Sequence, residues 1–195
     1  HVSRPTARQA LQRLVDRGLL TRRRGVGTIV SPRHVHRPME LTSLMRDLVN
    51  AGHKVHTTIQ RYEARPANAQ EADVLKITEG TLIVHIERTR FANDEPIAVL
   101  TNFIPTDIAP TMQELESASL YDLMRERGVT LASARQVIGA RSATTKEAKL
   151  LSEHRGAALL TTQRTTYDPS GRIVEYGNHI YRASRYSFEA SLFAQ

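Results

Sequence analysis

The sequence predicts an α+β protein in which a strongly basic N-terminal segment precedes a duplicated body of helices and strands. The first observation is the charge: the chain has 195 residues and a formal net charge of +7. Residues 1–38 hold nine arginines and a single acid, Asp16, so they carry +8 and the remainder carries −1. The second is a helix followed by a basic hairpin in this segment. The third is an internal repeat in the rest of the chain.

The composition excludes several classes of protein. The chain has no cysteine, which excludes disulfides, thiolate zinc sites, iron–sulfur clusters and cysteine nucleophiles. No apolar run approaches the roughly 18 residues that a membrane span needs, and the polar start is unlike a signal peptide. We therefore expect a cytoplasmic protein with no membrane contact and no cofactor. Because the sequence begins at His1 rather than methionine, we also expect that its natural start is missing.

The basic segment begins with a predicted amphipathic helix. Ser3 is a good N-cap, and Pro5 is tolerated in the first turn. Gly18 is placed to end the helix. Apolar residues recur with helical spacing on one face, at Ala7, Ala10, Leu11, Leu14 and Val15.

A basic hairpin is predicted next, with strands at 19–22 and 28–30 joined by a turn that contains Arg23, Arg24, Gly25 and Gly27. Helix followed by basic hairpin is the second half of a winged helix-turn-helix, so residues 1–31 are predicted to be part of a DNA-binding domain. The helix would enter the major groove, and the hairpin tip would reach the backbone or the minor groove.

Residues 32–40 are predicted to be a linker, because two prolines and mixed charge break both periodicities. His34 and His36 could ligate a metal, but with no third ligand nearby we interpret them as linker residues and predict no metal site.

The body, residues 41–195, contains a repeat with an offset of 76 residues. Units 41–102 and 117–178 align without gaps and share 15 of 62 residues, including the pairs Arg88/Arg164 and Ser43/Ser119. Diverse matched residues exclude low-complexity bias, so we predict two structural copies related by a pseudo-two-fold axis.

Each unit is predicted to contain helix, strand, helix, strand and strand. The first helices span about 43–51 and 119–127, and the next strands about 55–63 and 131–139. A second helix begins at Asn68 or Thr144, each with a glutamate three residues later, and Gly80 or Gly156 is predicted to close it. Hairpins turn at 93–96 and 168–171. Six long, mostly antiparallel strands backed by helices follow from this pattern.

Two arginines in the body are candidate ligands for an anion. Arg88 and Arg90 lie two apart in a strand and so share one otherwise apolar face, where burial without an anionic partner is costly. The alternative is pairing with the nearby acids Glu87 and Glu95. Ser43 and Ser119 begin equivalent helices, where each could simply cap its helix or help to bind an anion.

The basic segment resembles the DNA-binding domain of the GntR family of bacterial regulators through SRPTARQALQRLVDRGLLTRRRGVGTIV, residues 3–30. The resemblance implies that the first helix and the start of the second are missing from this chain. It also implies a set of operator contacts, which are Ser3, Arg4, Thr6, Arg8, Gln9, Arg23, Arg24, Gly25 and Gly27.

The body resembles the UTRA effector-binding domain of the HutC subfamily, which has a chorismate-lyase-like fold. The matching segments are ERTRFANDEPIAVLTNFIP (87–105), SLYDLMRERGV (119–129) and IVEYGNHIYRASRYSF (173–188). In amino-sugar-sensing members, residues that match Ser43, Arg88, Arg90, Ser119 and Tyr121 hold the ligand phosphate. Residues that match Glu175 and Tyr181 hold the sugar. The chain departs from that pattern at Leu100, where those members carry an acid.

Together, these features predict a ligand-responsive transcriptional repressor. It would act as a homodimer that binds operator DNA and responds to a small anionic effector, either a sugar phosphate or a carboxylate. Two alternatives are a chorismate-lyase-like enzyme acting on a small anion and a nucleic-acid-binding protein without a small-molecule site. We predict no catalytic residues, because the sequence contains no glycine-rich phosphate loop, zinc-protease pattern or nucleophile elbow.

Overall fold

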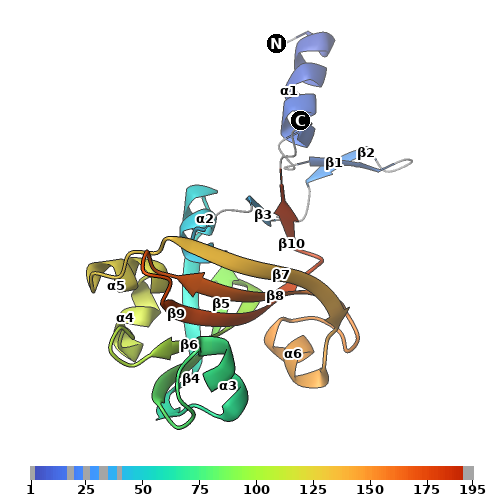
Figure 1. The fold of residues 1–195 in the computed structure, drawn as a ribbon. Coiled ribbons are helices and arrows are strands. Elements are labelled where there is room, and N and C mark those ends of the chain that lie inside the picture. The colour runs from blue at the N-terminus through green and yellow to red at the C-terminus, as the bar shows by residue number, and fades with distance from the viewer. Residues whose placement is uncertain (1–2, 17–19, 24–26, 31–34, 39–40, 191–195) are drawn as a thin grey trace, which may run out of the picture.

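The computed structural model describes residues 3–16, 20–23, 27–30, 35–38 and 41–190. Its α+β architecture confirms the predicted fold class. Helix α1 (Arg4–Asp16) and the hairpin of β1 (Leu20–Arg23) and β2 (Gly27–Val30) project from one end of a body made of helices around a sheet (Figure 1). The Ser3 hydroxyl accepts from the Thr6 amide and so caps α1 as predicted. Gly18 lies outside the described residues.

A six-stranded antiparallel sheet is the centre of the body, with strand order β4-β5-β6-β9-β8-β7. Strands β4, β5 and β6 come from the first repeat unit, and β7, β8 and β9 come from the second. They span Val55–Pro66, Leu82–Ala92, Glu95–Pro105, Ser133–Ser142, Ala158–Tyr167 and Ile173–Arg182. Both β4 and β7 extend three residues beyond their predicted ends.

The strand register reveals the pseudo-two-fold axis between the two units. At the centre of the sheet Thr101 pairs with Asn178 and Asn102 pairs with Gly177. Since Asn178 is the repeat equivalent of Asn102 and Gly177 that of Thr101, the two pairs exchange under the symmetry. Across the axis, Arg46 bonds to Asp122 through Nη2 and Oδ1 at 2.9 Å, and these two residues are also 76 apart. The predicted axis is therefore confirmed.

Helices pack on both faces of the sheet. One face carries α2 (Leu44–Asn50), α4 (Met112–Ser117) and α5 (Leu120–Glu126), whose apolar residues share clusters with Val84, Ile86 and Ala98. Helices α3 (Ala69–Leu75) and α6 (Thr145–Leu150) cover the opposite face. Helix α4 was not predicted.

The second helix of each unit is held by the same arrangement of side chains. Asn68 and Glu71 form a capping box at α3, and Thr144 and Glu147 form one at α6. Each glutamate also accepts two hydrogen bonds from an arginine of the preceding strand, at 2.6 and 2.7 Å. These are the bonds from Arg65 to Glu71 and from Arg141 to Glu147.

The predicted role of Gly80 and Gly156 as helix ends is wrong. Helix α3 ends at Leu75, and Lys76 itself takes the left-handed conformation with φ 55°. Gly80 lies in the next turn, where its amide donates to the Ala67 carbonyl, as Gly156 does to that of Ala143. The glycines close the loop onto the preceding strand rather than terminating the helix.

Part of the predicted linker forms a strand. Strand β3 (Val35–Pro38) pairs in parallel with β10 (Tyr186–Glu189) at the end of the body, with Val35 opposite Tyr186. Val35 is 3% exposed and belongs to the same apolar cluster as Leu44, Leu100 and Tyr181. The segment that leads from the basic end is therefore anchored in the body.

The arginine-backed capping boxes predict a specific stability defect. Glu71→Ala or Glu147→Ala should each lower the free energy of unfolding by about 1–2 kcal/mol, because each removes half a capping box and a bidentate ion pair. Glu79→Ala and Glu126→Ala are the matched controls, because both glutamates are exposed. Each should change the free energy of unfolding, measured by urea denaturation, by less than about 0.5 kcal/mol.

The Glu147 effect should also depend on pH. The hydrogen bonds from Arg141 hold the pKa of Glu147 at about 2, below its ordinary 4.5. A lowered folded-state pKa gives stability that is present above pH 4.5 and lost as the pH falls toward 2. The difference in free energy of unfolding between wild type and Glu147→Ala should therefore shrink as the pH falls through that window. A difference that stays constant would contradict the pairing of Glu147 with Arg141.

Candidate functional site

A pocket lies between the sheet and the first turns of α2 and α5. It encloses about 420 Å³, counting the part open to solvent. Its lining comes from α2, α5 and the four inner strands, so both repeat units contribute. The lining residues are Thr42, Ser43, Leu44, Met45, Arg88, Arg90, Leu100, Asn102, Ser119, Leu120, Tyr121, Arg164, Glu175, His179 and Tyr181.

All seven residues that the resemblance implies for the effector lie around this one pocket. They come from four elements, α2, β5, α5 and β9, and are up to 138 positions apart in the sequence. They are Ser43, Arg88, Arg90, Ser119, Tyr121, Glu175 and Tyr181.

Arg88 and Arg90 are almost completely buried, at 2% exposure each. Arg88 donates from Nη2 to Asn102 at 2.7 Å, and Arg90 donates from Nη1 to the Thr57 hydroxyl. Nε and Nη1 of Arg88 and Nε of Arg90 have no hydrogen-bond partner among the described residues. Buried donors of this kind are costly unless a ligand pairs with them.

Pairing with local acids is not what balances these arginines. Glu87 lies 3.5 Å from Lys146 Nζ on the other face of the sheet, and Glu95 pairs with Arg182. The alternative considered from the sequence is therefore wrong, because strand alternation turns Glu87 away from the pocket.

Glu175 is the one buried acid among the described residues and is 0% exposed. Its Oε1 accepts from Asn102 at 2.6 Å, and its Oε2 accepts from Thr166 at 2.7 Å and from the Tyr121 hydroxyl at 3.2 Å. Asn102 thus connects Arg88 to Glu175. The carboxylate is fixed by neutral donors from both repeat units.

The two serines behave differently. Ser43 Oγ accepts from the Arg46 amide at 3.1 Å, which is ordinary helix capping. Ser119 makes no such bond, and its buried hydroxyl has no partner among the described residues. Ser43 therefore acts as a helix cap. The Ser119 hydroxyl can instead donate a hydrogen bond to an acceptor in the pocket.

Three polar side chains of the inner strands line the pocket without having been predicted to do so. Arg164 is 6% exposed and donates to Gln136 at 2.7 Å and to the Tyr121 hydroxyl at 3.3 Å. Its identity with Arg88 in the repeat was the signal that could have found it. Asn102 and His179 gave no comparable signal, and they lie in the wall because of strand register alone.

The balance of charge in the pocket is positive. Three buried arginines face one buried glutamate. Burial lowers the pKa of Arg88 to about 10 and that of Arg90 to about 9, where the charge of Arg88 is a second cause, so both remain protonated at neutral pH. Burial raises the pKa of Tyr121 to about 12, which keeps its hydroxyl as a neutral donor. The site is suited to a small anion.

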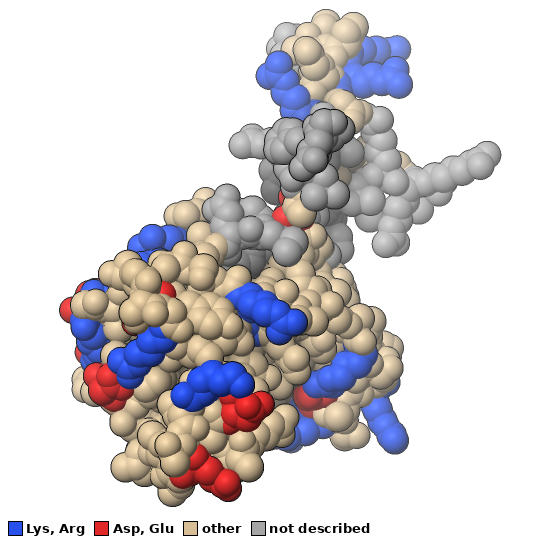
Figure 2. All heavy atoms as spheres, viewed as in Figure 1, with Lys and Arg blue, Asp and Glu red and all other residues tan. Residues whose placement is uncertain are grey.

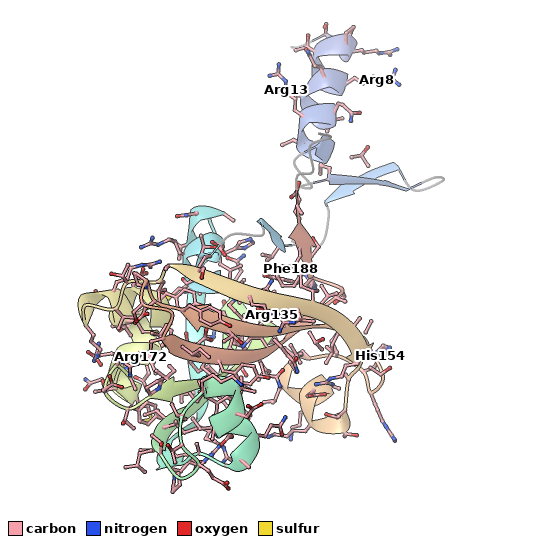
Figure 3. The ribbon with its side chains drawn as sticks, in the orientation of Figure 1. Arg8, Arg13, Arg135, His154, Arg172 and Phe188 are labelled. Carbon is pink, nitrogen blue, oxygen red and sulfur yellow. The ribbon has the colours of Figure 1, made fainter. Side chains whose placement is uncertain are left out.

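The residues implied for DNA contact lie in the projecting end. Ser3, Arg4, Thr6, Arg8 and Gln9 are exposed in or beside the first turns of α1, and Gly27 begins β2. The described basic side chains of α1 extend into solvent, whereas basic and acidic side chains are interleaved on the face of the body that Figure 2 shows (Figures 2 and 3). Arg24, Gly25 and the side chain of Arg23 lie outside the described residues.

A metal site has no support in the described part of the chain, where no three potential ligands gather. His34 and the side chain of His36 lie outside it. None of the described helices is long and apolar enough to cross a membrane.

Comparison with known proteins identifies the two parts of the chain. Residues 50–187 match the UTRA domain, and residues 1–30 match the gntR family of bacterial regulatory proteins. The chain belongs to the GntR family of UTRA-containing regulators. It is a transcriptional regulator, and its relatives are regulators rather than enzymes, so the lyase-like alternative is wrong.

Two curated relatives and one solved structure illustrate the match. The chain is 34% identical over 190 residues to the transcriptional repressor NagR of Bacillus subtilis, covering 96% of this chain and 78% of that protein. It is 27% identical to the histidine utilization repressor of Klebsiella aerogenes, and the match covers 96% of this chain and 78% of that protein. The crystal structure of PhnF from Mycobacterium smegmatis superposes with a TM-score of 0.88 at 26% identity, covering all of this chain and 87% of that one.

The wall of the regulator's pocket is packed too tightly around Gly177 to accept a side chain there. A Cβ at this position would lie 2.5 Å from His179 Nε2 and 2.6 Å from Glu175 Oε1. Gly177→Ala should therefore displace the carboxylate and lower the melting temperature by several degrees, at about 1–3 kcal/mol for overpacking.

The control is Gly139→Ala on edge strand β7, where the new Cβ meets only the rotatable Thr161 hydroxyl at 3.0 Å. Differential scanning calorimetry should show a larger fall in melting temperature for Gly177→Ala than for Gly139→Ala. An equal fall in both variants would mean that Glu175 has room to move.

Proposed function

We propose that the chain is a ligand-responsive repressor whose affinity for operator DNA is modulated by a small anionic effector, a sugar phosphate or a carboxylate, bound in the pocket. The observation that carries this proposal is the excess of buried positive charge, with three arginines against one glutamate. The alternative of a nucleic-acid-binding protein without a small-molecule site does not account for buried arginine donors that lack partners among the described residues. A location in the cytoplasm, where operator DNA is available, is part of the proposal.

The anion would bind among groups whose hydrogen-bonding capacity is unused. Nε and Nη1 of Arg88, Nε of Arg90 and the Ser119 hydroxyl all lie around the pocket without partners among the described residues. Charge-assisted bonds to an oxyanion are among the strongest that a protein makes, and burial strengthens them further. Tyr181 and the carboxylate of Glu175, which accepts three hydrogen bonds from its neighbours, would border the rest of the ligand.

At the DNA end, we propose that α1 lies in the major groove and that the hairpin tip contacts the backbone or the minor groove. The proposed contacts in the helix are Ser3, Arg4, Thr6, Arg8 and Gln9, and those in the hairpin are Arg23, Arg24, Gly25 and Gly27. We propose domain limits of 1–31 and 41–195, with residues 32–40 between them. Two half-sites of an operator require a two-fold assembly, so a homodimer is part of the proposal.

The effector could act on the DNA end through the wall of the pocket. Tyr181 lines the pocket, and its ring stacks on that of Tyr186 in β10 with centroids 4.3 Å apart. Phe188 of β10 packs edge-on against both rings, and it lies at the junction of body and projecting end (Figure 3). Since β10 pairs with β3, a shift of Tyr181 would reach the chain segment that leads to α1. Control by a ligand requires that it favour one of two such arrangements.

The anion site is tested by removing its charges. In the full-length regulator, Arg88→Ala/Arg90→Ala should abolish the rise in melting temperature caused by a bound sugar phosphate, which for saturation near 100 Kd is roughly 5–10 °C. The probes are glucose 6-phosphate, inorganic phosphate and citrate in a thermal-shift assay. Operator binding, measured with DNA selected by the regulator from random sequences, should persist but no longer respond to the ligand.

Arg135→Ala/Arg172→Ala is the matched control, because it removes two exposed arginines from the body's surface. It should leave the ligand-induced shift unchanged. If Arg88→Ala/Arg90→Ala fails to fold, Arg90→Met keeps the volume of the side chain and should itself lose the shift. A ligand response that survives loss of these arginines would refute the proposed site.

The route through the aromatic stack predicts a separation of binding from response. Tyr186→Ala should preserve ligand-induced thermal stabilisation within about two-fold in Kd, while at least halving the effect of the ligand on operator affinity measured by fluorescence anisotropy. Tyr176→Ala, which removes a half-buried tyrosine on the other face, is the control. If Tyr186→Ala retains the full response, the effector acts by another route.

A further inference from the structure

The first turns of two helices from different repeat units border the pocket. Residues 42–45 line it at the start of α2, and residues 119–121 line it at the start of α5. The residue that follows in each helix is charged and lies outside this lining. These residues are Arg46 and Asp122, and they pair with each other, with Nη2 of Arg46 2.9 Å from Oδ1 of Asp122. An ion pair therefore joins the two helices directly beside the residues that border the pocket.

The two helices pack into different apolar clusters. Leu44 and Leu48 of α2 lie in the cluster that contains Tyr186 of β10. The buried apolar residues of α5 lie instead with Val84 and Ile86 of β5. Among the described residues, none of α2 shares an apolar cluster with one of α5. The ion pair is thus a polar link between two helices that are packed separately.

The ion pair is built so that it can open at little cost. Both side chains reach solvent, with 55% of Arg46 and 31% of Asp122 exposed, and exposed pairs are weak. Oδ1 of Asp122 also lies 2.9 Å from Nη1 of Arg125, which is three residues further along α5. If Arg46 moves away, the carboxylate therefore keeps a second partner. A link of this kind holds two elements together and can still release, as a pocket that must admit a ligand requires.

We propose that Arg46 and Asp122 form a clasp that holds α2 against α5 and stabilises the closed pocket around a bound effector. The proposal rests on the proposed function, because the ligand that is retained is the proposed anion. Neither residue lines the pocket, so both are positioning residues that act through their helices. Opening of the clasp would move Ser43 away from Ser119 and widen the pocket.

Distances between the two helices, measured by electron paramagnetic resonance, test the clasp without any ligand. The chain has no cysteine, so Val49→Cys/Glu126→Cys confines spin labels to two exposed positions, one in α2 and one in α5. At low salt the labelled full-length protein should give one narrow distance distribution. Asp122→Asn keeps the shape of the side chain and removes its charge, and adding it should broaden the distribution toward longer distances. About 0.5 M NaCl should have the same effect without this substitution, because salt screens exposed charges.

Arg125→Gln is the matched control for the distance measurement. It removes the second partner of Asp122 and leaves the link to α2 in place. The distance distribution should therefore stay narrow at low salt. Identical distributions with and without Asp122→Asn at low salt would overturn the proposal.

The effect of the clasp on the ligand is tested by isothermal titration calorimetry with glucose 6-phosphate. Asp122→Asn and Arg46→Gln should each raise Kd about two- to five-fold at low salt, the size expected for loss of an exposed ion pair. The double variant should bind no more weakly than either single variant, because both substitutions remove the same interaction. Arg46→Lys keeps the charge and should bind more tightly than Arg46→Gln. Additive losses from the two single variants would show that each side chain acts alone, which would contradict the clasp.

Inorganic phosphate separates failure of the clasp from failure of the anion site. If neither glucose 6-phosphate nor inorganic phosphate binds the wild-type protein, the proposed anion site is wrong, and the distance measurement alone decides whether the clasp exists. If the ligand binds and the two single variants leave both Kd and the distances unchanged, the anion site stands and the clasp is wrong.

Discussion

The pocket depends on an excess of positive charge held away from water. Moving a guanidinium group out of solvent costs several kcal/mol unless its charge and its N–H groups are matched, and here three such groups share one carboxylate. Arg88 and Arg90 keep donors without partners among the described residues. The surrounding sheet and its helices must be stable enough to hold these groups in place.

Duplication explains how a small body builds such a site. The two units meet at β6 and β9, and the pseudo-two-fold axis brings the first turns of α2 and α5 to the same edge of the pocket. Arg88 and its equivalent Arg164 are both buried there, but they have different partners. Arg88 bonds to Asn102, whereas Arg164 bonds to Gln136 and Tyr121. The backbone is therefore close to symmetric, while the side chains that line the pocket are not. A symmetric frame with different side chains can bind an asymmetric ligand.

The fold was largely predictable because its signals are local and repeated. Hydrophobic periodicity, two capping boxes and the 76-residue offset were enough to predict six antiparallel strands and the symmetry axis. The errors came from backbone choices that composition does not reveal. Lys76, rather than Gly80, takes the left-handed position after α3, and helix α4 lies in a segment without a strong apolar stripe.

The site was predictable in part, for a different reason. The clustering of seven residues followed from family resemblance, and strand alternation placed Arg88 and Arg90 on one face. The hydrogen-bond network through Asn102 could not be predicted, since it depends on which side chains the β5–β6 and β6–β9 registers place side by side. The same holds for the stack of Tyr181 on Tyr186, because β10 returns to pair with β3 over a long sequence separation.

The central claim is that the buried arginines form an anion site, and a crystal of the protein soaked in tungstate tests it most directly. Tungstate is a tetrahedral dianion whose anomalous scattering locates it without ambiguity. The account predicts a peak in the pocket within hydrogen-bond distance of Nε of Arg88, Nε of Arg90 and the Ser119 hydroxyl. Peaks confined to surface arginines, with the pocket free of tungstate at saturating concentration, would contradict it.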